Sequence, residues 1–106
     1  MLFIPLEKPG SPTIAKLDIQ PTSLKVKWTA PTDDGGSQIT AYRVVIIKGS
    51  TEIKNVNISD PGITSLSLGG LERNTPYTVK VFARNAVFEG PAAEKKLRTN
   101  YEGNKL

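Results

Sequence analysis

The stretch that decides the fold reads Leu71-Glu72-Arg73-Asn74-Thr75-Pro76-Tyr77-Thr78-Val79-Lys80-Val81-Phe82-Ala83-Arg84-Asn85. Its first part is rich in turn-forming residues and ends at a proline, and from Tyr77 onward apolar and polar residues alternate. A period of two places Tyr77, Val79, Val81 and Ala83 on one face of a β-strand. The stretch therefore predicts a half-buried strand that follows a tight turn.

The same period recurs outward from this stretch. In the segment Leu24-Lys25-Val26-Lys27-Trp28, apolar residues alternate with lysines, and residues that favour turns separate such runs at short intervals. No stretch combines helical spacing with helix caps. We expect strands at 13–19, 23–29, 39–48, 52–57, 64–68, 76–85 and 92–99. The predicted fold class is all-β: a seven-stranded antiparallel β-sandwich of the immunoglobulin-like type.

Composition narrows the function. The chain has 106 residues, enough for one domain with its own core, and contains neither cysteine nor histidine. Disulfides, thiolate metal sites and the commonest general base are thereby excluded, so we expect no enzyme, no cofactor and no small-molecule substrate. The net charge of +4 is scattered along the chain, which argues against a nucleic acid partner, and no apolar run is long enough for membrane insertion.

Proline and polar residues set the expected domain limits. Residues 1–11 contain Pro5 and Pro9 and are predicted to be a linker or the end of a preceding domain. The domain is expected at 12–99, and the polar segment 100–106 is expected to be a C-terminal linker. Connectors on both sides suggest a module with neighbours in a larger chain.

Three segments together resemble the fibronectin type III family over about residues 11–99. The segment 21–31 resembles that family's second strand, with Trp28 as its core tryptophan, and 39–44 is similar to its third strand. The segment 71–85 resembles its most diagnostic stretch. We expect Trp28, Tyr42, Leu71 and Tyr77 in the core. The Tyr77 hydroxyl should hydrogen-bond to the backbone between residues 71 and 74, in a tyrosine corner.

The resemblance implies that partners bind at loops on one end of the sandwich or at a sheet face. The Arg-Gly-Asp signal of some members is missing from the loop at 85–91, where Val87, Phe88 and Glu89 stand instead. A large aromatic residue at a loop tip either packs down, here near Pro31, or meets a partner. Val87, Phe88 and Glu89 are therefore candidate protein-binding residues.

A second candidate surface follows from the strand at 39–48. If Tyr42, Val44 and Ile46 point inward, Val45 and Ile47 point outward. Together with Phe82 they would form an exposed apolar patch, with Arg84 among the charges at its rim. The alternative is that these residues only stabilise the strands through cross-strand pairing.

Two weaker signals remain. Asn57-Ile58-Ser59 is an acceptor sequence for N-glycosylation, which makes Asn57 a candidate site. Asp33 and Asp34 lack the spacing of a calcium loop and are better explained as turn residues, so no metal is expected.

Two functions from different classes follow. The first is a protein-interaction module of a cell-surface adhesion or receptor protein, outside the cell. The second is a purely structural spacer in a tandem array, such as that of a giant intracellular muscle protein, which would be cytoplasmic and sarcomeric. In either case the expected partners are other proteins, adjacent domains of the same chain or homophilic contacts.

Overall fold

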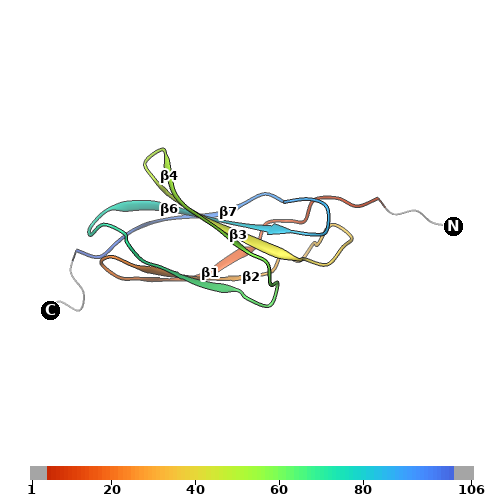
Figure 1. Ribbon diagram of the computed structural model, residues 1–106, viewed down its shortest axis with the longest axis horizontal. Helices are drawn as coiled ribbons and strands as arrows, with labels where there is room; N and C mark the ends of the chain where they lie inside the picture. Colours follow the sequence, from red (N-terminus) through yellow and green to blue (C-terminus); the bar gives the residue numbers. More distant parts are fainter. Residues whose placement is uncertain (1–4, 102–106) are drawn as a thin grey trace.

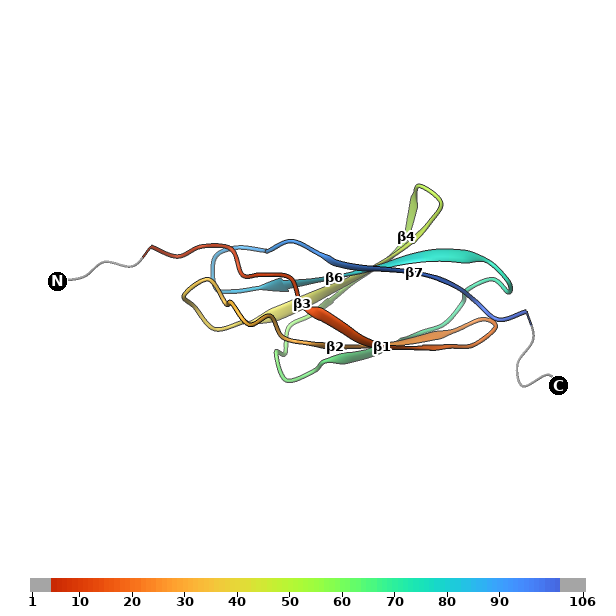
Figure 2. The ribbon, with the colours of Figure 1, turned by 180° about the vertical axis from the view of Figure 1, so that it is seen from behind.

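Two antiparallel sheets pack face to face in the part of the chain that the computed structural model describes, residues 5–101 (Figures 1 and 2). One sheet has the order β1-β2-β5 and the other β4-β3-β6-β7. The strands are β1 (Thr13–Ile19), β2 (Leu24–Thr29), β3 (Ala41–Lys48), β4 (Thr51–Ile58), β5 (Ser65–Leu68), β6 (Pro76–Arg84) and β7 (Ala93–Arg98). The predicted all-β sandwich is confirmed, and the strand limits fall within two residues of those expected.

The core forms from the inward phase of each alternating strand. In β2 the three apolar residues are buried and the residues between them are exposed, as a strand with one face on the core requires. Trp28 fills the space between the sheets, and its ring meets the edge of Tyr42 at a centroid distance of 5.5 Å. Leu71 and Tyr77 also lie in this core.

The loops are divided between the two ends of the sandwich. The chain enters at one end and leaves at the opposite end, as both ribbon views show (Figures 1 and 2). The β2–β3 and β6–β7 loops lie at the N-terminal end, and the β5–β6 loop lies at the C-terminal end (Figure 1). The hairpin between β3 and β4 projects away from its sheet (Figure 1).

The segment before β1 is packed against the N-terminal loops. Its Pro9 is almost fully buried, the Glu7 amide donates to the Gly35 carbonyl at 2.9 Å, and the Gly10 amide donates to the Asp33 carbonyl at 2.8 Å. We call residues 7–10 the N-terminal strap. These residues lie within the segment 1–11 that was expected to be a linker, whereas residues 1–4 and 102–106 of the expected linkers lie outside the described residues.

Candidate protein-interaction surfaces

The outer face of the four-stranded sheet does not carry the apolar patch predicted there. Val45 has the outward phase, but only 2% of it is exposed. The strand register sets it between Lys80 of β6 and Asn55 of β4. A short branched side chain between longer neighbours is covered by them, because the methylene stems of lysines lie along apolar surface. The prediction that Val45 is exposed is therefore wrong, and Ile47 and Phe82 are only partly exposed.

An ion pair covers the third member of that patch. The Arg43 guanidinium lies 4.1 Å from the centroid of the Phe82 ring, and its Nε and Nη2 donate to the two carboxylate oxygens of Glu89 at 2.8 and 2.9 Å. Hydrogen bonding from Arg43 lowers the pKa of the Glu89 carboxyl, outweighing the opposing effect of burial. Glu89, a candidate binding residue from the sequence, is thus bound to Arg43. Arg84 lies opposite Glu89 in an isolated bridge and is exposed.

Asn85 connects the β6–β7 loop to the rest of the N-terminal end. Its side chain is fully buried, and its amide nitrogen donates to the carbonyls of Glu7 at 2.8 Å and Asp34 at 2.9 Å. Its amide oxygen accepts from the backbone N–H groups of Val87 at 3.0 Å and Phe88 at 2.8 Å. One side chain therefore holds the strap, the β2–β3 loop and the β6–β7 loop together.

Two glycines make room for the strap. A Cβ at Gly35 would lie 2.1 Å from the Glu7 carbonyl oxygen, and a Cβ at Gly90 would lie 2.1 Å from that of Pro9. No side chain fits at such a distance, so the backbone of the strap can lie here only because both positions are glycine. Gly35 also has a φ of 76°, in the region that favours glycine. The sequence indicates that both glycines are turn residues. That they also make room for the backbone of the strap follows only from the structure.

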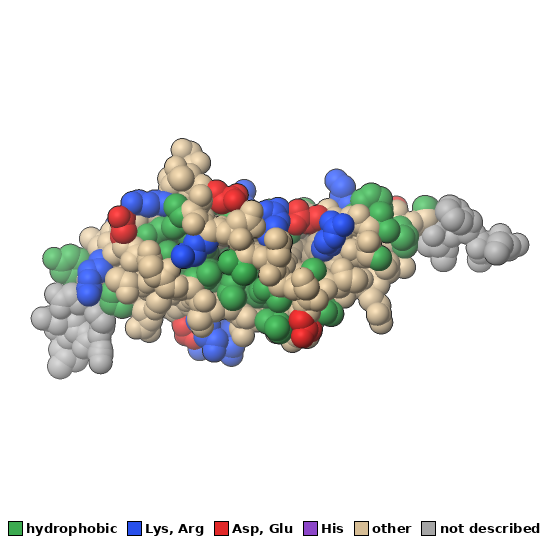
Figure 3. Space-filling view, viewed as in Figure 1, with side chains coloured by type: hydrophobic (Ala, Val, Ile, Leu, Met, Phe, Trp, Pro, Cys, Tyr) green, Lys and Arg blue, Asp and Glu red, His purple; other side chains and the backbone are tan. Residues whose placement is uncertain are grey.

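Three exposed apolar side chains belong to the segments that this joint connects. Leu6 is 40% exposed, Val87 48% and Phe88 38%. Leu6 precedes the strap and approaches Gly36, with its Cδ2 3.6 Å from where a Cβ would stand, while the other two follow Asn85. Figure 3 shows apolar side chains at this end of the molecule. We call Leu6, Val87 and Phe88 the N-terminal apolar cluster; the sequence indicates its second and third members, but not Leu6.

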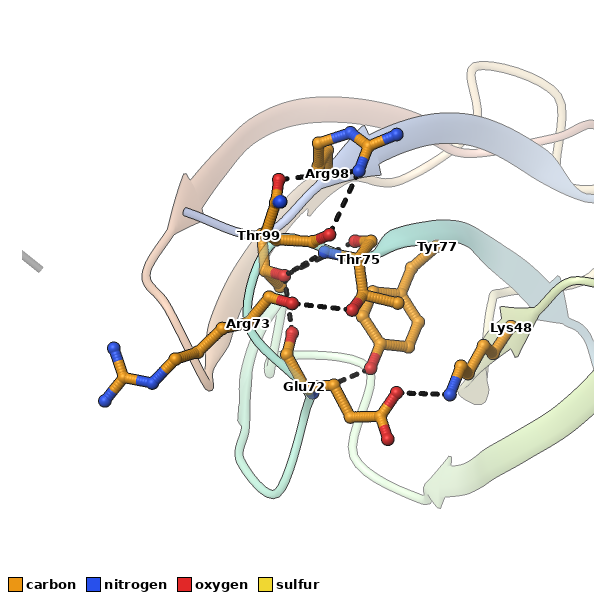
Figure 4. A network of polar contacts seen from close by, with 8 residues as sticks. Lys48, Glu72, Arg73, Thr75, Tyr77, Arg98 and Thr99 are labelled. Atoms are coloured by element: carbon orange, nitrogen blue, oxygen red, sulfur yellow. Dashed lines mark hydrogen bonds and ion pairs between the residues drawn. The ribbon is translucent and has the colours of Figure 1, made fainter. Parts of the chain in front are cut away.

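The C-terminal end is organised by a polar network around the tyrosine corner (Figure 4). The Tyr77 hydroxyl accepts a hydrogen bond from the backbone N–H of Glu72 at 2.8 Å, within the segment where the sequence places its partner. The Glu72 carboxylate forms an ion pair with Lys48 of β3, and the Thr75 amide donates to the Thr99 hydroxyl at 2.9 Å. These bonds hold the β5–β6 loop on the sandwich. They serve the structure of this end of the module.

Asn57 lies on β4, at the edge of its sheet, and is exposed. An exposed acceptor asparagine is accessible to a glycosyltransferase, so the site stays a prediction.

The carboxylates of Asp33 and Asp34 accept hydrogen bonds from the backbone N–H groups of Gly35 and Gly36, both at 2.9 Å. They are turn residues of this loop, and within residues 5–101 no cluster of three potential metal ligands occurs. The same residues contain no helix with the length and hydropathy to span a membrane.

Comparison with known proteins identifies the family. The sequence profile of the Fibronectin type III domain matches residues 7–99. The chain belongs to the fibronectin type III family. A relative, the "Titin homolog" of Caenorhabditis elegans, is 38% identical over 96 residues, which cover 86% of this chain and, to the nearest per cent, 0% of the relative. "Endoglucanase B" of Cellulomonas fimi is 31% identical over 73% of this chain and 7% of its own length.

Among solved structures, domains d3-d4 of the rat CD45 extracellular region superpose with a TM-score of 0.78 at 21% identity. The match covers 89% of this chain and 51% of that chain, and it shows the shared fold. The chain spans at most a tenth of the length of the curated relatives that it matches. It is thus an interaction or spacer module of a family that is typically non-catalytic and occurs in multidomain chains.

Proposed function

We propose that this module is a spacer in a multidomain polypeptide, holding its neighbours at opposite ends of a stiff sandwich. The observation that carries the proposal is that both ends of the described chain are hydrogen-bonded to the sandwich. The strap fixes the N-terminal side, and Asn100 fixes the C-terminal side. The Asn100 side chain donates to the Ile19 carbonyl at 2.9 Å, and the backbone carbonyl of Asn100 accepts from the backbone N–H of Asn74 at 3.2 Å.

The covered sheet face supports the same role. An adhesion module that binds through its four-stranded sheet needs accessible apolar groups, but Val45 is buried there and Arg43 lies over Phe82. What remains is a surface of paired charges and partly covered side chains, which contributes little binding energy. The relative from Caenorhabditis elegans, named a titin homolog, is so long that the match covers 0% of it to the nearest per cent, which agrees with a place in a long polypeptide. The role applies equally to a sarcomeric and to an extracellular array.

A module exchange in the parent protein tests the spacer role. Residues 5–101 are replaced by another fibronectin type III module of equal end-to-end length but unrelated surface, and in a second variant they are deleted. We expect the exchange to preserve the function of the parent protein and the deletion to impair it. Loss of function on exchange, with the replacement module folded, would show that surface residues of this module carry the function.

A receptor or adhesion role outside the cell is the second candidate, and the exposed tip of the β6–β7 loop favours it. Val87 and Phe88 are 48% and 38% exposed, although their backbone is held rigidly by Asn85. A rigid aromatic side chain is a suitable anchor for a partner protein. In the module exchange, transplanting residues 86–89 onto the replacement module would restore function if this loop binds a separate protein.

A further inference from the structure

The strand β5 is the outermost strand of its sheet and pairs only with β2 (Figures 1 and 2). The Trp28 N–H donates to the Thr64 carbonyl at 2.9 Å, so Thr64 directs its backbone groups toward β2. Because this direction alternates along an antiparallel strand, Ser65 and Ser67 direct their N–H and C=O groups away from the sheet. Ser67 is exposed and Ser65 partly exposed. These backbone groups can pair with a further strand.

The other three edge strands, β1, β4 and β7, carry features that oppose the addition of a strand. A bulge interrupts β1 at Ala15 and β4 at Ile53. Lys54 of β4 and Lys95 of β7 each lie opposite a fully buried residue of the neighbouring strand, so both lysines occupy inward positions on an edge. Bulges and inward-pointing charges protect the edges of natural sheets. The strand β5 has neither, and only its length of four residues limits pairing there.

The charges beside β5 are positive. On the outer face of the sheet, Lys27 lies opposite Lys16 of β1 on one side and Ser65 of β5 on the other. Like charges directly opposite each other destabilise a sheet. The single acidic residue of the three strands, Asp18, lies on β1 at 3.5 Å from Lys16, and Lys27 has no ion-pair partner within residues 5–101. An anion on the β5 side of Lys27 would relieve this repulsion.

Short side chains on β5 leave the lysines of β2 accessible from the open edge. Ser65 lies opposite Lys27. Ser67 lies opposite Lys25, whose other neighbour is the acid on β1. A strand added to β5 would lie about 9–10 Å from β2, a distance that a lysine and a glutamate side chain together span across a serine. Its alternate residues would pack beside Leu66, which has the inward phase but is only partly buried.

These features together select one kind of partner. We propose that the edge of β5 binds an extended segment of another protein in which acidic residues alternate with apolar ones, so that the segment adds a strand to the three-stranded sheet. The contact goes beyond the spacer function, because this partner lies beside the module and not ahead of it or behind it in the chain. A second copy of the chain fits less well: two copies paired through β5 would set the lysines of both β2 strands against one another across serines alone.

A titration with synthetic peptides, followed by the backbone amide resonances of the module, tests the proposal. The probe is Glu-Val-Glu-Val-Glu-Val with blocked ends, and the controls are Lys-Val-Lys-Val-Lys-Val and the reordered Glu-Glu-Glu-Val-Val-Val. We expect only the probe to shift the amides of Ser65 and Ser67 and to slow their hydrogen exchange. Methylating the backbone nitrogens of alternate residues removes the donors along one edge of the probe. Of the two peptides methylated on opposite edges, one should bind and the other should not.

Two variants separate the backbone contact from the charge contact. Ser67→Pro removes an N–H that faces away from β2, where an edge strand tolerates proline, and should abolish binding while the module stays folded. Lys27→Glu keeps the backbone edge and should weaken binding of the probe at least about threefold. The matched control is Lys96→Glu, at an exposed position of β7 in the other sheet, which should leave binding unchanged.

Unmoved amides in β5 would overturn the proposal, as would equal shifts with the lysine peptide or the reordered peptide. Undiminished binding in Lys27→Glu would do the same. If the amides of Ser65 and Ser67 shift when the module alone is concentrated, a second copy occupies the edge and the proposed partner is wrong. The module exchange described above reports independently on the spacer function in each of these cases.

Discussion

Replacing Asn85 by alanine tests the central role of its side chain at the N-terminal end. The substitution removes four hydrogen bonds: the donations to Glu7 and Asp34, and the bonds accepted from Val87 and Phe88. Each bond contributes about 0.5–1.5 kcal/mol net, so we expect the free energy of unfolding to fall by about 2–6 kcal/mol. That is a large fraction of the roughly 5–15 kcal/mol that stabilises a typical domain.

Urea unfolding followed by the fluorescence of Trp28, the single tryptophan, measures this loss. Hydrogen exchange shows which part of the protein loses stability. The backbone amides of Glu7 and Gly10, which donate to the β2–β3 loop, should exchange much faster in the variant. An isolated loss of protection in the strap would mean that the strap opens without the rest of the sandwich. A general loss would mean that strap and sandwich unfold together.

Asn85→Asp distinguishes hydrogen bonding from simple packing. The aspartate retains an acceptor for the β6–β7 loop, but it sets a carboxylate oxygen against the carbonyls of Glu7 and Asp34. Burial, together with the two carbonyls that face the second oxygen, raises the pKa of that carboxyl above its ordinary value and outweighs the hydrogen bonds from Val87 and Phe88 to the first oxygen, so the folded state takes up a proton more readily than the unfolded state. The deficit of the variant relative to wild type should therefore be largest at pH 7 and shrink as the pH falls toward 4. The reasoning is refuted if Asn85→Ala costs less than about 1 kcal/mol, below the range for these bonds, or if the deficit of Asn85→Asp is independent of pH.

Three further predictions concern single side chains. Glu89→Gln should reduce the free energy of unfolding by about 0.5–1 kcal/mol at pH 7, because the bidentate pair with Arg43 is partly exposed. Because the folded-state pKa of Glu89 is lowered, its contribution is complete above the ordinary pKa of 4.5 and is lost as the pH falls through the folded-state pKa; wild type and variant should converge in acid denaturation curves. Tyr77→Phe leaves the Glu72 amide without its acceptor and should cost about 1–3 kcal/mol in urea unfolding, whereas an unchanged midpoint would contradict the corner's role. Secretion from a eukaryotic cell should add a glycan mass to the wild type but not to Asn57→Gln, and equal masses would remove the site.

Local alternation makes the fold predictable from the sequence. In β6 each apolar residue from Tyr77 to Ala83 stands two positions from the next, and all are buried. The same rule predicts the burial of Trp28, and these predictions depend only on neighbours in the sequence and on one rule, that a strand has two faces. The tyrosine corner, in contrast, is implied by the resemblance of the segment 71–85 to the family's most diagnostic stretch.

The same rule fails where a side chain's exposure depends on more distant neighbours. Val45 has the outward phase, yet side chains from β4 and β6 cover it, and only the register determines which ones. The strap was missed because Pro5 and Pro9 favour an extended segment but do not reveal whether that segment packs. One signal was present. Asn85 continues the inward phase of β6 beyond Ala83, and a polar residue at an inward position requires buried hydrogen-bond partners.

The strap also determines which piece of the gene can be moved as a unit. A cut before Pro12, at the start of the strands, would separate Asn85 from the Glu7 carbonyl and leave the surfaces of Gly35 and Gly90 uncovered. A chimaera joined there would carry every strand of the sandwich and still lose part of its stability. Exon shuffling, or a designer grafting this module into a new protein, should therefore place the junction ahead of Leu6. The heritable unit is longer than the sandwich by about half a dozen residues, a length comparable to an ordinary connecting loop.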